Sequence, residues 1–136
     1  MAKPISRREH ALTDYSYIPT VAAAPRLFGF QNEPRAARLC GVFSGAILLS
    51  TLFTRAEWGV FRTLPYRDHL RIDTAVGVAA LAMPWLFGFA HNARARDTFL
   101  AMGMMGIMAG TLSEPGEMPP TNDFTRLSGA QHEEAR

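Results

Sequence analysis

His69 and Asp73 are the two residues of this chain whose types and spacing could together do acid–base chemistry. Residues four apart share one face of a helix, and Asp73 would lie about 6 Å further along the axis than His69. An ionisable residue just inside a membrane helix is a candidate proton relay or general base. The alternative, which we favour, is that Asp68 and Asp73 complement the helix dipole and are neutralised by a nearby arginine. On that interpretation the chain has no catalytic residue.

The sequence predicts no cofactor and no metal site. Haem ligation would need histidines that face each other within helices, whereas we expect His10 and His132 in the tails, His69 at one membrane face and His91 at the other. Cys40 is the single cysteine, so it fits a small packing residue better than a zinc ligand. A net charge of +2, from 14 basic and 12 acidic residues, argues against a nucleic-acid surface.

The average composition, with 48% hydrophobic and 19% charged residues, is that of an ordinary globular protein. Three segments without Asp, Glu, Lys or Arg nevertheless stand out, and helices formed by these segments would have to position the side chains named above. These uncharged runs cover residues 39–54, 74–90 and 98–113 and are slightly short for membrane spans. Flanking arginines could lengthen each one by lifting their guanidinium groups to the headgroups. We therefore expect membrane helices; the alternative is a soluble bundle with very apolar core helices.

A hexapeptide occurs twice, as PRLFGF at residues 25–30 and as PWLFGF at residues 84–89. If one residue is inserted after Phe89, the offset becomes 60 and Asn32 matches Asn92, as Ile47 matches Ile107. Each unit then reads as a helix, a PxLFGF exit, a polar loop and a second helix. The predicted fold is all-α, an integral membrane four-helix bundle built from two parallel helical-hairpin repeats, with helices near residues 12–28, 35–54, 68–89 and 94–113.

The corresponding organisation has five parts. We expect a cytosolic leader at residues 1–14, a first helical-hairpin repeat at 15–54, an interfacial connector at 55–67, a second helical-hairpin repeat at 68–113 and a disordered tail at 114–136. The first helix is the weakest element, because it may either span the membrane or lie in the interface; the repeat favours spanning.

The hexapeptide itself has an architectural explanation. A proline bends the end of a helix, aromatic rings suit the headgroup level, and a glycine can take the left-handed conformation that closes a helix. The following asparagines, Asn32 and Asn92, are good helix caps. The residues of the repeat motif are Pro25, Phe28, Gly29, Phe30, Pro84, Trp85, Phe87, Gly88 and Phe89.

The second unit resembles the SPW-repeat family of small bacterial membrane proteins, in which an (S)PW motif ends one helix and a glycine-containing helix follows. Here the tripeptides read Met83-Pro84-Trp85 and Ala24-Pro25-Arg26. The resemblance covers residues 68–113 well and 15–54 weakly. It implies a paired-hairpin membrane protein and brings no established reaction.

Four spans would place both termini on one membrane face. Nine basic residues then lie on the face with the termini and five on the face with the hexapeptides, which predicts cytosolic termini in a bacterial inner membrane protein. The nine are Lys3, Arg7, Arg8, Arg55, Arg62, Arg67, Arg71, Arg126 and Arg136, and the five are Arg26, Arg35, Arg38, Arg94 and Arg96.

Two Gly-x-x-x-Gly pairs predict helix packing, Gly41 with Gly45 and Gly106 with Gly110. We expect them to pack against each other within the chain, the alternative being a dimer interface. The connector alternates aromatic and basic residues and is expected to face anionic lipid headgroups or a partner protein; these residues are Arg55, Trp58, Phe61, Arg62, Tyr66 and Arg67.

Three classes of function follow from this pattern. An accessory or assembly subunit of a membrane complex, associating with the bilayer and with other subunits or with itself, is the first. A small transporter or channel that works as an oligomer is the second. A membrane enzyme that uses His69 and Asp73 is the third.

Overall fold

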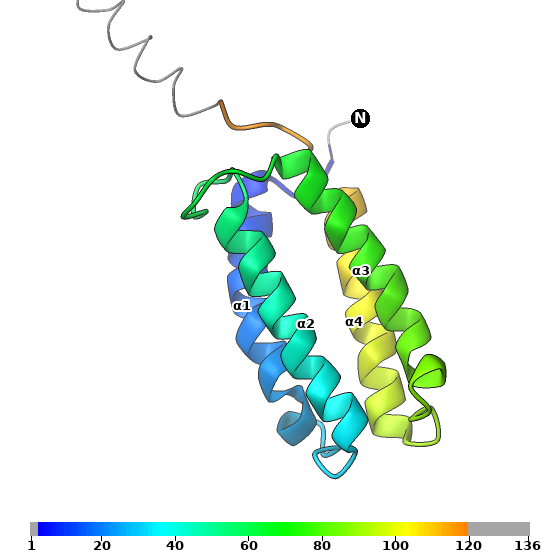
Figure 1. Ribbon diagram of the computed structural model, residues 1–136. Coiled ribbons are helices and arrows are strands. Elements are labelled where there is room, and N and C mark those ends of the chain that lie inside the picture. Colours follow the sequence, from blue (N-terminus) through cyan, green and yellow to red (C-terminus); the bar gives the residue numbers. More distant parts are fainter. Residues whose placement is uncertain (1–2, 120–136) are drawn as a thin grey trace, which may run out of the picture.

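The computed structural model describes residues 3–119, which form four helices joined by short loops (Figure 1). Their bounds are α1 Arg7–Leu27, α2 Pro34–Phe53, α3 Tyr66–Leu86 and α4 Ala93–Leu112. Helices α1 and α2 form one hairpin and α3 and α4 the other, with both hairpin turns at the same end of the molecule. The prediction of an all-α chain is confirmed over the described residues.

The two hairpins repeat at a constant offset of 59 residues. Both ends of α1 and α3, and both ends of α2 and α4, differ by this number. The predicted insertion after Phe89 is therefore wrong, and Asn92 corresponds to Glu33. The side chain of Asn92 caps α4 by accepting from the Ala95 amide at 3.2 Å, whereas Glu33 occupies the cap of α2 without a side-chain bond.

The hexapeptides close the first helix of each hairpin. Gly29 and Gly88 both have φ of 70°, the left-handed conformation that was predicted for them. Phe30 and Phe89 are 1% and 0% exposed, so these two rings belong to the core rather than to the surface. The rings before the glycines, Phe28 and Phe87, and that of Trp85 stay exposed.

Helices α3 and α4 lie close together because glycines face each other. A Cβ placed on Gly77 would lie 2.7 Å from the carbonyl oxygen of Gly103, and one on Gly106 would lie 3.1 Å from the Gly77 Cα. Gly110 likewise faces the carbonyl of Leu70. The backbone contact that glycines permit thus holds the second hairpin together.

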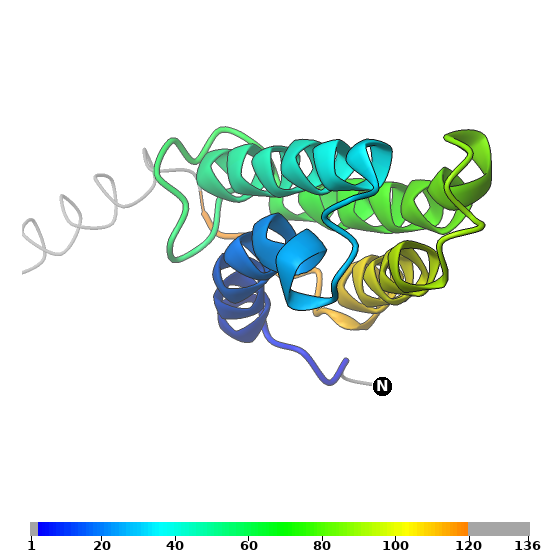
Figure 2. The ribbon, with the colours of Figure 1, turned by 90° about the horizontal axis from the view of Figure 1, so that it is seen from below.

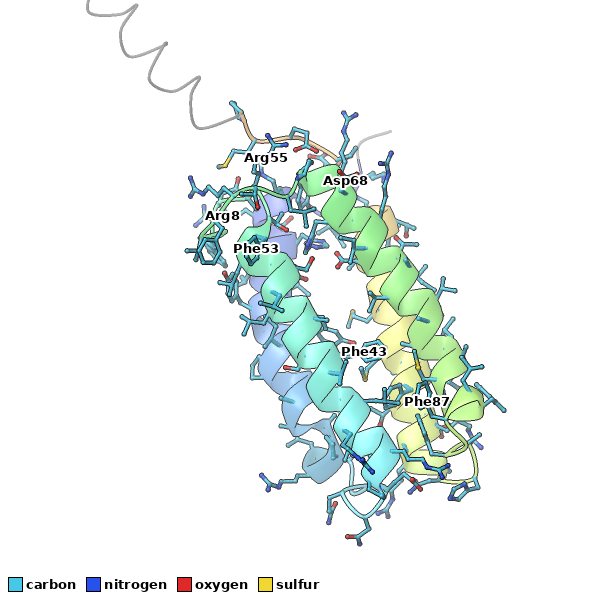
Figure 3. The ribbon with its side chains drawn as sticks, viewed as in Figure 1. Arg8, Phe43, Phe53, Arg55, Asp68 and Phe87 are labelled. Atoms are coloured by element: carbon cyan, nitrogen blue, oxygen red, sulfur yellow. The ribbon has the colours of Figure 1, made fainter. Side chains whose placement is uncertain are left out.

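The predicted packing of Gly41 and Gly45 against Gly106 and Gly110 is wrong. Both Gly41 and Gly45 are exposed, and a Cβ on either would meet no atom within 4 Å. The reason is that α4 turns its glycines towards α3, while α2 and α4 meet through larger side chains. Phe43 extends from α2 into the space between the hairpins (Figure 3) and contacts Phe99 edge to face at 5.9 Å.

The ends of the described chain are better ordered than predicted. Helix α1 begins at Arg7, inside the expected leader, because Ser6 and Glu9 form a capping box. Glu117, in the expected disordered tail, accepts hydrogen bonds from the amides of Tyr66 and Arg67 at 3.1 and 2.8 Å. The rest of that tail, residues 120–136, lies outside the described residues.

The two hairpins lie side by side, as the view from below shows (Figure 2). The chain also joins them at the end opposite the hairpin turns. Ile5 forms a bridge with Ser113 there, and Leu64 forms the equivalent bridge with Thr54. Of the four described helices, α2 alone is long and apolar enough to cross a membrane by length and composition.

Candidate metal centre

Two helices contribute a His-x-x-x-Asp pair to one buried cluster, which we call the His–Asp cluster: His10 and Asp14 from α1, and His69 and Asp73 from α3. The two pairs are related by the offset of 59 residues. In each pair, the i, i+4 spacing places both side chains on the helix face that is turned towards the other hairpin. His10 and His69 are 2% and 1% exposed.

The four ligand atoms of the His–Asp cluster lie close together. His10 Nε2 is 3.1 Å from His69 Nε2, 3.5 Å from Asp14 Oδ2 and 3.0 Å from Asp73 Oδ2. His69 Nε2 is 3.0 Å from Asp14 Oδ2 and 3.2 Å from Asp73 Oδ2. Four ligands bound at about 2.0–2.1 Å to a tetrahedral zinc ion are about 3.3–3.4 Å from one another. Five of the six distances among the four atoms are therefore within a few tenths of an ångström of tetrahedral spacing, and all four atoms lie within 4.8 Å of one another.

Hydroxyl groups behind the imidazoles indicate which ring nitrogen carries the proton. Ser113 Oγ donates to a carbonyl in α4 at 2.7 Å, so it accepts from His10 Nδ1 at 2.8 Å. Thr54, the equivalent residue in the other repeat, donates to the Ser50 carbonyl at 2.6 Å and accepts from His69 Nδ1 at 2.9 Å. Ser50 Oγ lies 2.8 Å from the same nitrogen and shares its proton. Both Nε2 atoms then present a lone pair to the centre, as in metal-binding histidines.

The electrostatics of the His–Asp cluster call for positive charge at its centre. When both imidazoles are neutral, the two carboxylates give the cluster two negative charges, the complement of a divalent cation. Asp73 Oδ2 is buried without a well-oriented hydrogen bond, although it lies within 3.2 Å of both imidazoles. Two added protons would also balance the charge, but each Nε2 could then donate to only one of its three neighbours. A metal ion at the centre would be a shared partner for all four atoms.

The site is largely closed, since the side chains of its four residues are between 1% and 13% exposed. The free space among the side chains that line it is about 10 Å³, which is about the least that holds one water molecule. The buried ring of Tyr66 stacks on His69 and meets His10 edge to face, with centroids 6.1 and 5.7 Å apart. No substrate could approach a bound ion here without movement of these groups.

An ion pair fastens the connector across this end of the bundle. Arg7 Nη2 lies 2.8 Å from Glu57 Oε1, and Arg7 Nε donates to both carboxylate oxygens. These hydrogen bonds hold the pKa of the Glu57 carboxyl below its ordinary value, so the pair is formed at neutral pH. The connector thereby covers the His–Asp cluster.

The structure brings the predicted pair His69 and Asp73 together with two residues that the sequence analysis missed, His10 and Asp14. His10 lies in α1 and not in a tail, because α1 begins earlier than predicted. The signal that could have found the pair is the repeat itself: His10 and Asp14 precede His69 and Asp73 by the same 59 positions that separate the hexapeptides.

The connector residues do not form one surface. Trp58, Phe61 and Arg67 are exposed, as an interfacial segment requires. Tyr66 is 1% exposed and belongs to the wall of the His–Asp cluster, so its predicted place at the lipid or partner interface is wrong. Arg62 turns back to donate to the carbonyls of Glu57 and Gly59, and Arg55 is half-buried.

Comparisons with protein-family models, with curated proteins and with solved structures found no match for this chain. The geometry of the His–Asp cluster therefore carries the functional argument by itself. The resemblance to the SPW-repeat family stays a prediction.

Proposed function

We propose that this chain is a small multi-pass membrane protein in which one divalent transition-metal ion, bound by the His–Asp cluster, fastens two hairpin repeats together. The fastened bundle acts as an accessory or assembly subunit of a membrane complex. The observation that carries the proposal is that four ligand atoms from two repeats lie within 4.8 Å of one another, with each imidazole nitrogen within 3.5 Å of both carboxylate oxygens.

The ligand set favours zinc among the common divalent ions. Imidazole nitrogen suits zinc and its neighbours in the transition series, whereas sites for magnesium and calcium consist of oxygen atoms. Four single-atom ligands from rigid helices suit the four-coordinate geometry of zinc. Because all four positions come from protein and the site is closed, the ion is structural rather than catalytic. This argues against the enzyme hypothesis for His69 and Asp73.

The membrane part of the proposal rests on the outer surface of the bundle. Large apolar side chains are exposed on α2, α3 and α4, among them Val42, Leu49, Val78, Leu86 and Met104. Soluble monomers seldom expose apolar residues over so much of their surface. Charged side chains gather instead towards the two ends of the helices. We propose that all four helices cross the inner membrane, with both termini and the His–Asp cluster at the cytosolic end.

Metal content of the purified protein tests the metal proposal. The full chain would be extracted in mild detergent without chelators and analysed by inductively coupled plasma mass spectrometry. We expect one zinc or related ion per chain, loss of the ion in Asp73→Asn, and retention of it in His91→Gln. His91 is a matched control because it lies at the other end of the bundle, paired with Glu33 and largely exposed.

Cobalt provides a second measurement that reports geometry. Chelator-treated protein should take up one equivalent of Co²⁺ and develop the intense visible absorption of a four-coordinate complex. A chain that is purified without metal and takes up neither Zn²⁺ nor Co²⁺, while remaining helical by circular dichroism, would overturn the proposal. The cluster would then be balanced by protons instead.

A further inference from the structure

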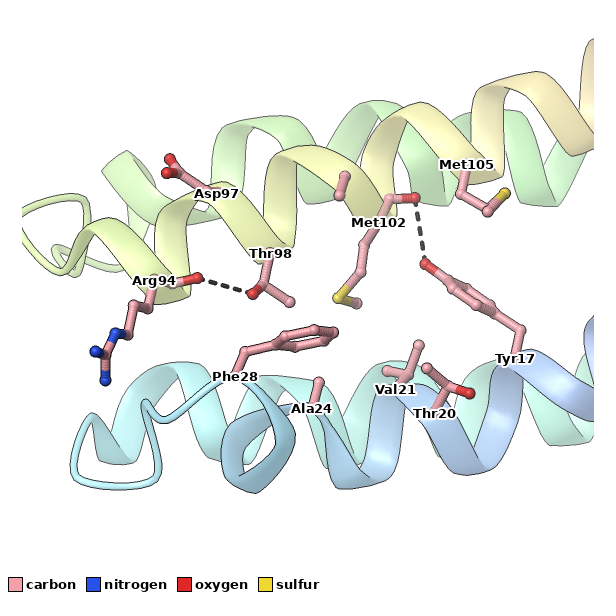
Figure 4. A pocket seen from close by; sticks show the side chains of 11 residues that line it. Tyr17, Thr20, Val21, Ala24, Phe28, Arg94, Asp97, Thr98, Met102 and Met105 are labelled. Carbon is pink, nitrogen blue, oxygen red and sulfur yellow. Dashed lines mark hydrogen bonds between the residues drawn. The ribbon is translucent and has the colours of Figure 1, made fainter.

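Two grooves run between the hairpins at the end of the bundle that carries the hexapeptides. The first lies between α1 and α4 and measures about 470 Å³; Figure 4 shows Phe28 and Val21 on one side of it and Met102 on the other. The second lies between α2 and α3 and measures about 630 Å³. The offset of 59 residues relates them, since Phe87 and Arg35 line the second groove as Phe28 and Arg94 line the first.

The grooves differ in charge at one pair of equivalent positions. The first groove is lined by one arginine and one carboxylate, Arg94 and Asp97, and Asp97 also pairs with Arg96 at 2.9 Å. The second carries Arg35 and Arg38, and no carboxylate lines it. No acidic side chain within the described residues forms an ion pair with either of these two arginines. The α2–α3 groove is therefore the more basic of the two, with two arginines and no carboxylate among its lining residues against one of each in the first groove.

Backbone carbonyls hold both guanidinium groups at this groove. Arg35 Nη1 donates to the Phe87 carbonyl at 3.0 Å, and Arg38 Nε donates to the Pro34 carbonyl at 3.2 Å. The remaining N–H groups are free to bind an anion, and guanidinium groups suit phosphate oxygens in particular. Beside them lies an exposed apolar wall, with Trp85 59% and Leu86 72% exposed.

We propose that the α2–α3 groove binds an anionic phospholipid, with its phosphate on Arg35 and Arg38 and an acyl chain along Leu86 and Trp85. A phosphate beside an acyl chain matches two cations beside an apolar wall. A soluble anion would leave that wall exposed. The inference rests on the proposed membrane location and is independent of the proposed metal ion.

Trp85 is a reporter built into the groove. The chain has two tryptophans, and Trp58 lies in the connector at the other end of the bundle, so Trp58→Phe leaves one signal. The full chain with this substitution would be reconstituted in phosphatidylcholine vesicles that contain a minor fraction of brominated phosphatidylglycerol or, in a parallel sample, brominated phosphatidylcholine. Bromine on the acyl chain quenches tryptophan fluorescence on contact.

The difference in charge between the two grooves defines the variants to be tested. We expect the brominated anionic lipid to be preferred by about fivefold or more over the zwitterionic one. Arg38→Asp, which copies the charge of the first groove, should lower the preference to about one. Asp97→Arg and Arg94→Gln change only the first groove and should leave the preference at Trp85 unchanged.

Three other results would each refute a specific part of the proposal. Equal quenching by the two lipids in the inserted protein overturns the lipid site and leaves the membrane location standing. Loss of the preference in Arg94→Gln as large as in Arg38→Asp would assign it to overall charge and overturn the groove. Absence of quenching by both lipids would refute the membrane location and the lipid site together.

Discussion

Removal of the hydroxyl behind His10 should weaken metal binding without touching a ligand. In Ser113→Ala, His10 Nδ1 loses its only hydrogen-bond partner in the described structure, at 2.8 Å, and with it the preference for the tautomer that presents Nε2 to the ion. Losing such a partner typically costs about 10- to 100-fold in metal affinity. That factor corresponds to about 1.4 to 2.7 kcal/mol.

The other repeat should respond less, although it is equivalent by sequence. His69 Nδ1 has two hydroxyl partners, Thr54 Oγ1 at 2.9 Å and Ser50 Oγ at 2.8 Å. Thr54→Val therefore leaves one hydrogen-bond partner in place. It should lower the metal affinity by well under tenfold, which is less than the usual effect of losing every such partner. The double variant Ser50→Ala, Thr54→Val should cost as much as Ser113→Ala.

Competition with a fluorescent zinc chelator measures these affinities for each variant in the same detergent. Thermal unfolding of the metal-free proteins is the control, because a change confined to metal affinity should leave that stability similar. The assignment of the tautomers would be refuted if Thr54→Val weakened the metal affinity more than Ser113→Ala does. It would also be refuted if the double variant had no effect on the metal affinity.

Three further predictions concern packing, the hexapeptide and pH. Gly77→Ala should destabilise the protein by about 1–3 kcal/mol, because its Cβ would meet backbone atoms of α4 at 2.7 Å. Gly45→Ala, where the Cβ would lie in open space, should be neutral or stabilising by up to about 1 kcal/mol. Thermal unfolding in detergent compares the two variants, and a large loss of stability in Gly45→Ala would favour a dimer interface at Gly45. Gly88→Val should cost about 1 kcal/mol or more, because φ of 70° strains a β-branched residue; equal melting temperatures would contradict this. Because histidines bind a metal ion in their neutral form, zinc affinity and the stabilisation by metal should fall as the pH is lowered. Metal retained in dialysis at acid pH would contradict this.

Much of the fold could be predicted from the sequence because the repeat is strong. The uncharged runs and the hexapeptides located the two hairpins, and the glycines that close α1 and α3 were identified from their place in the motif. The errors came from the least apolar element. Helix α1 begins with charged residues, so its first turns were interpreted as a leader. For this reason His10 was assigned to a tail and was not recognised as part of a site.

The packing partners of the glycines could not be predicted from spacing. Gly41 and Gly45 have the same spacing as Gly106 and Gly110, yet only the second pair meets another helix. Which face of a helix is buried depends on the rotation of that helix in the bundle. In the second hairpin that rotation is set by Gly77 of α3, where the first hairpin has Ile18.

The sequence by itself determined the helical hairpins, their equivalence and the residue types that occur twice. Only the tertiary structure decided that the two copies of His-x-x-x-Asp meet in one cluster. The physical reason is that the hairpins pack side by side, with the first turns of α1 and α3 turned towards each other at one end. The repeat identifies the equivalent residues, whereas the packing of the hairpins determines which of them lie close enough together to bind one ion.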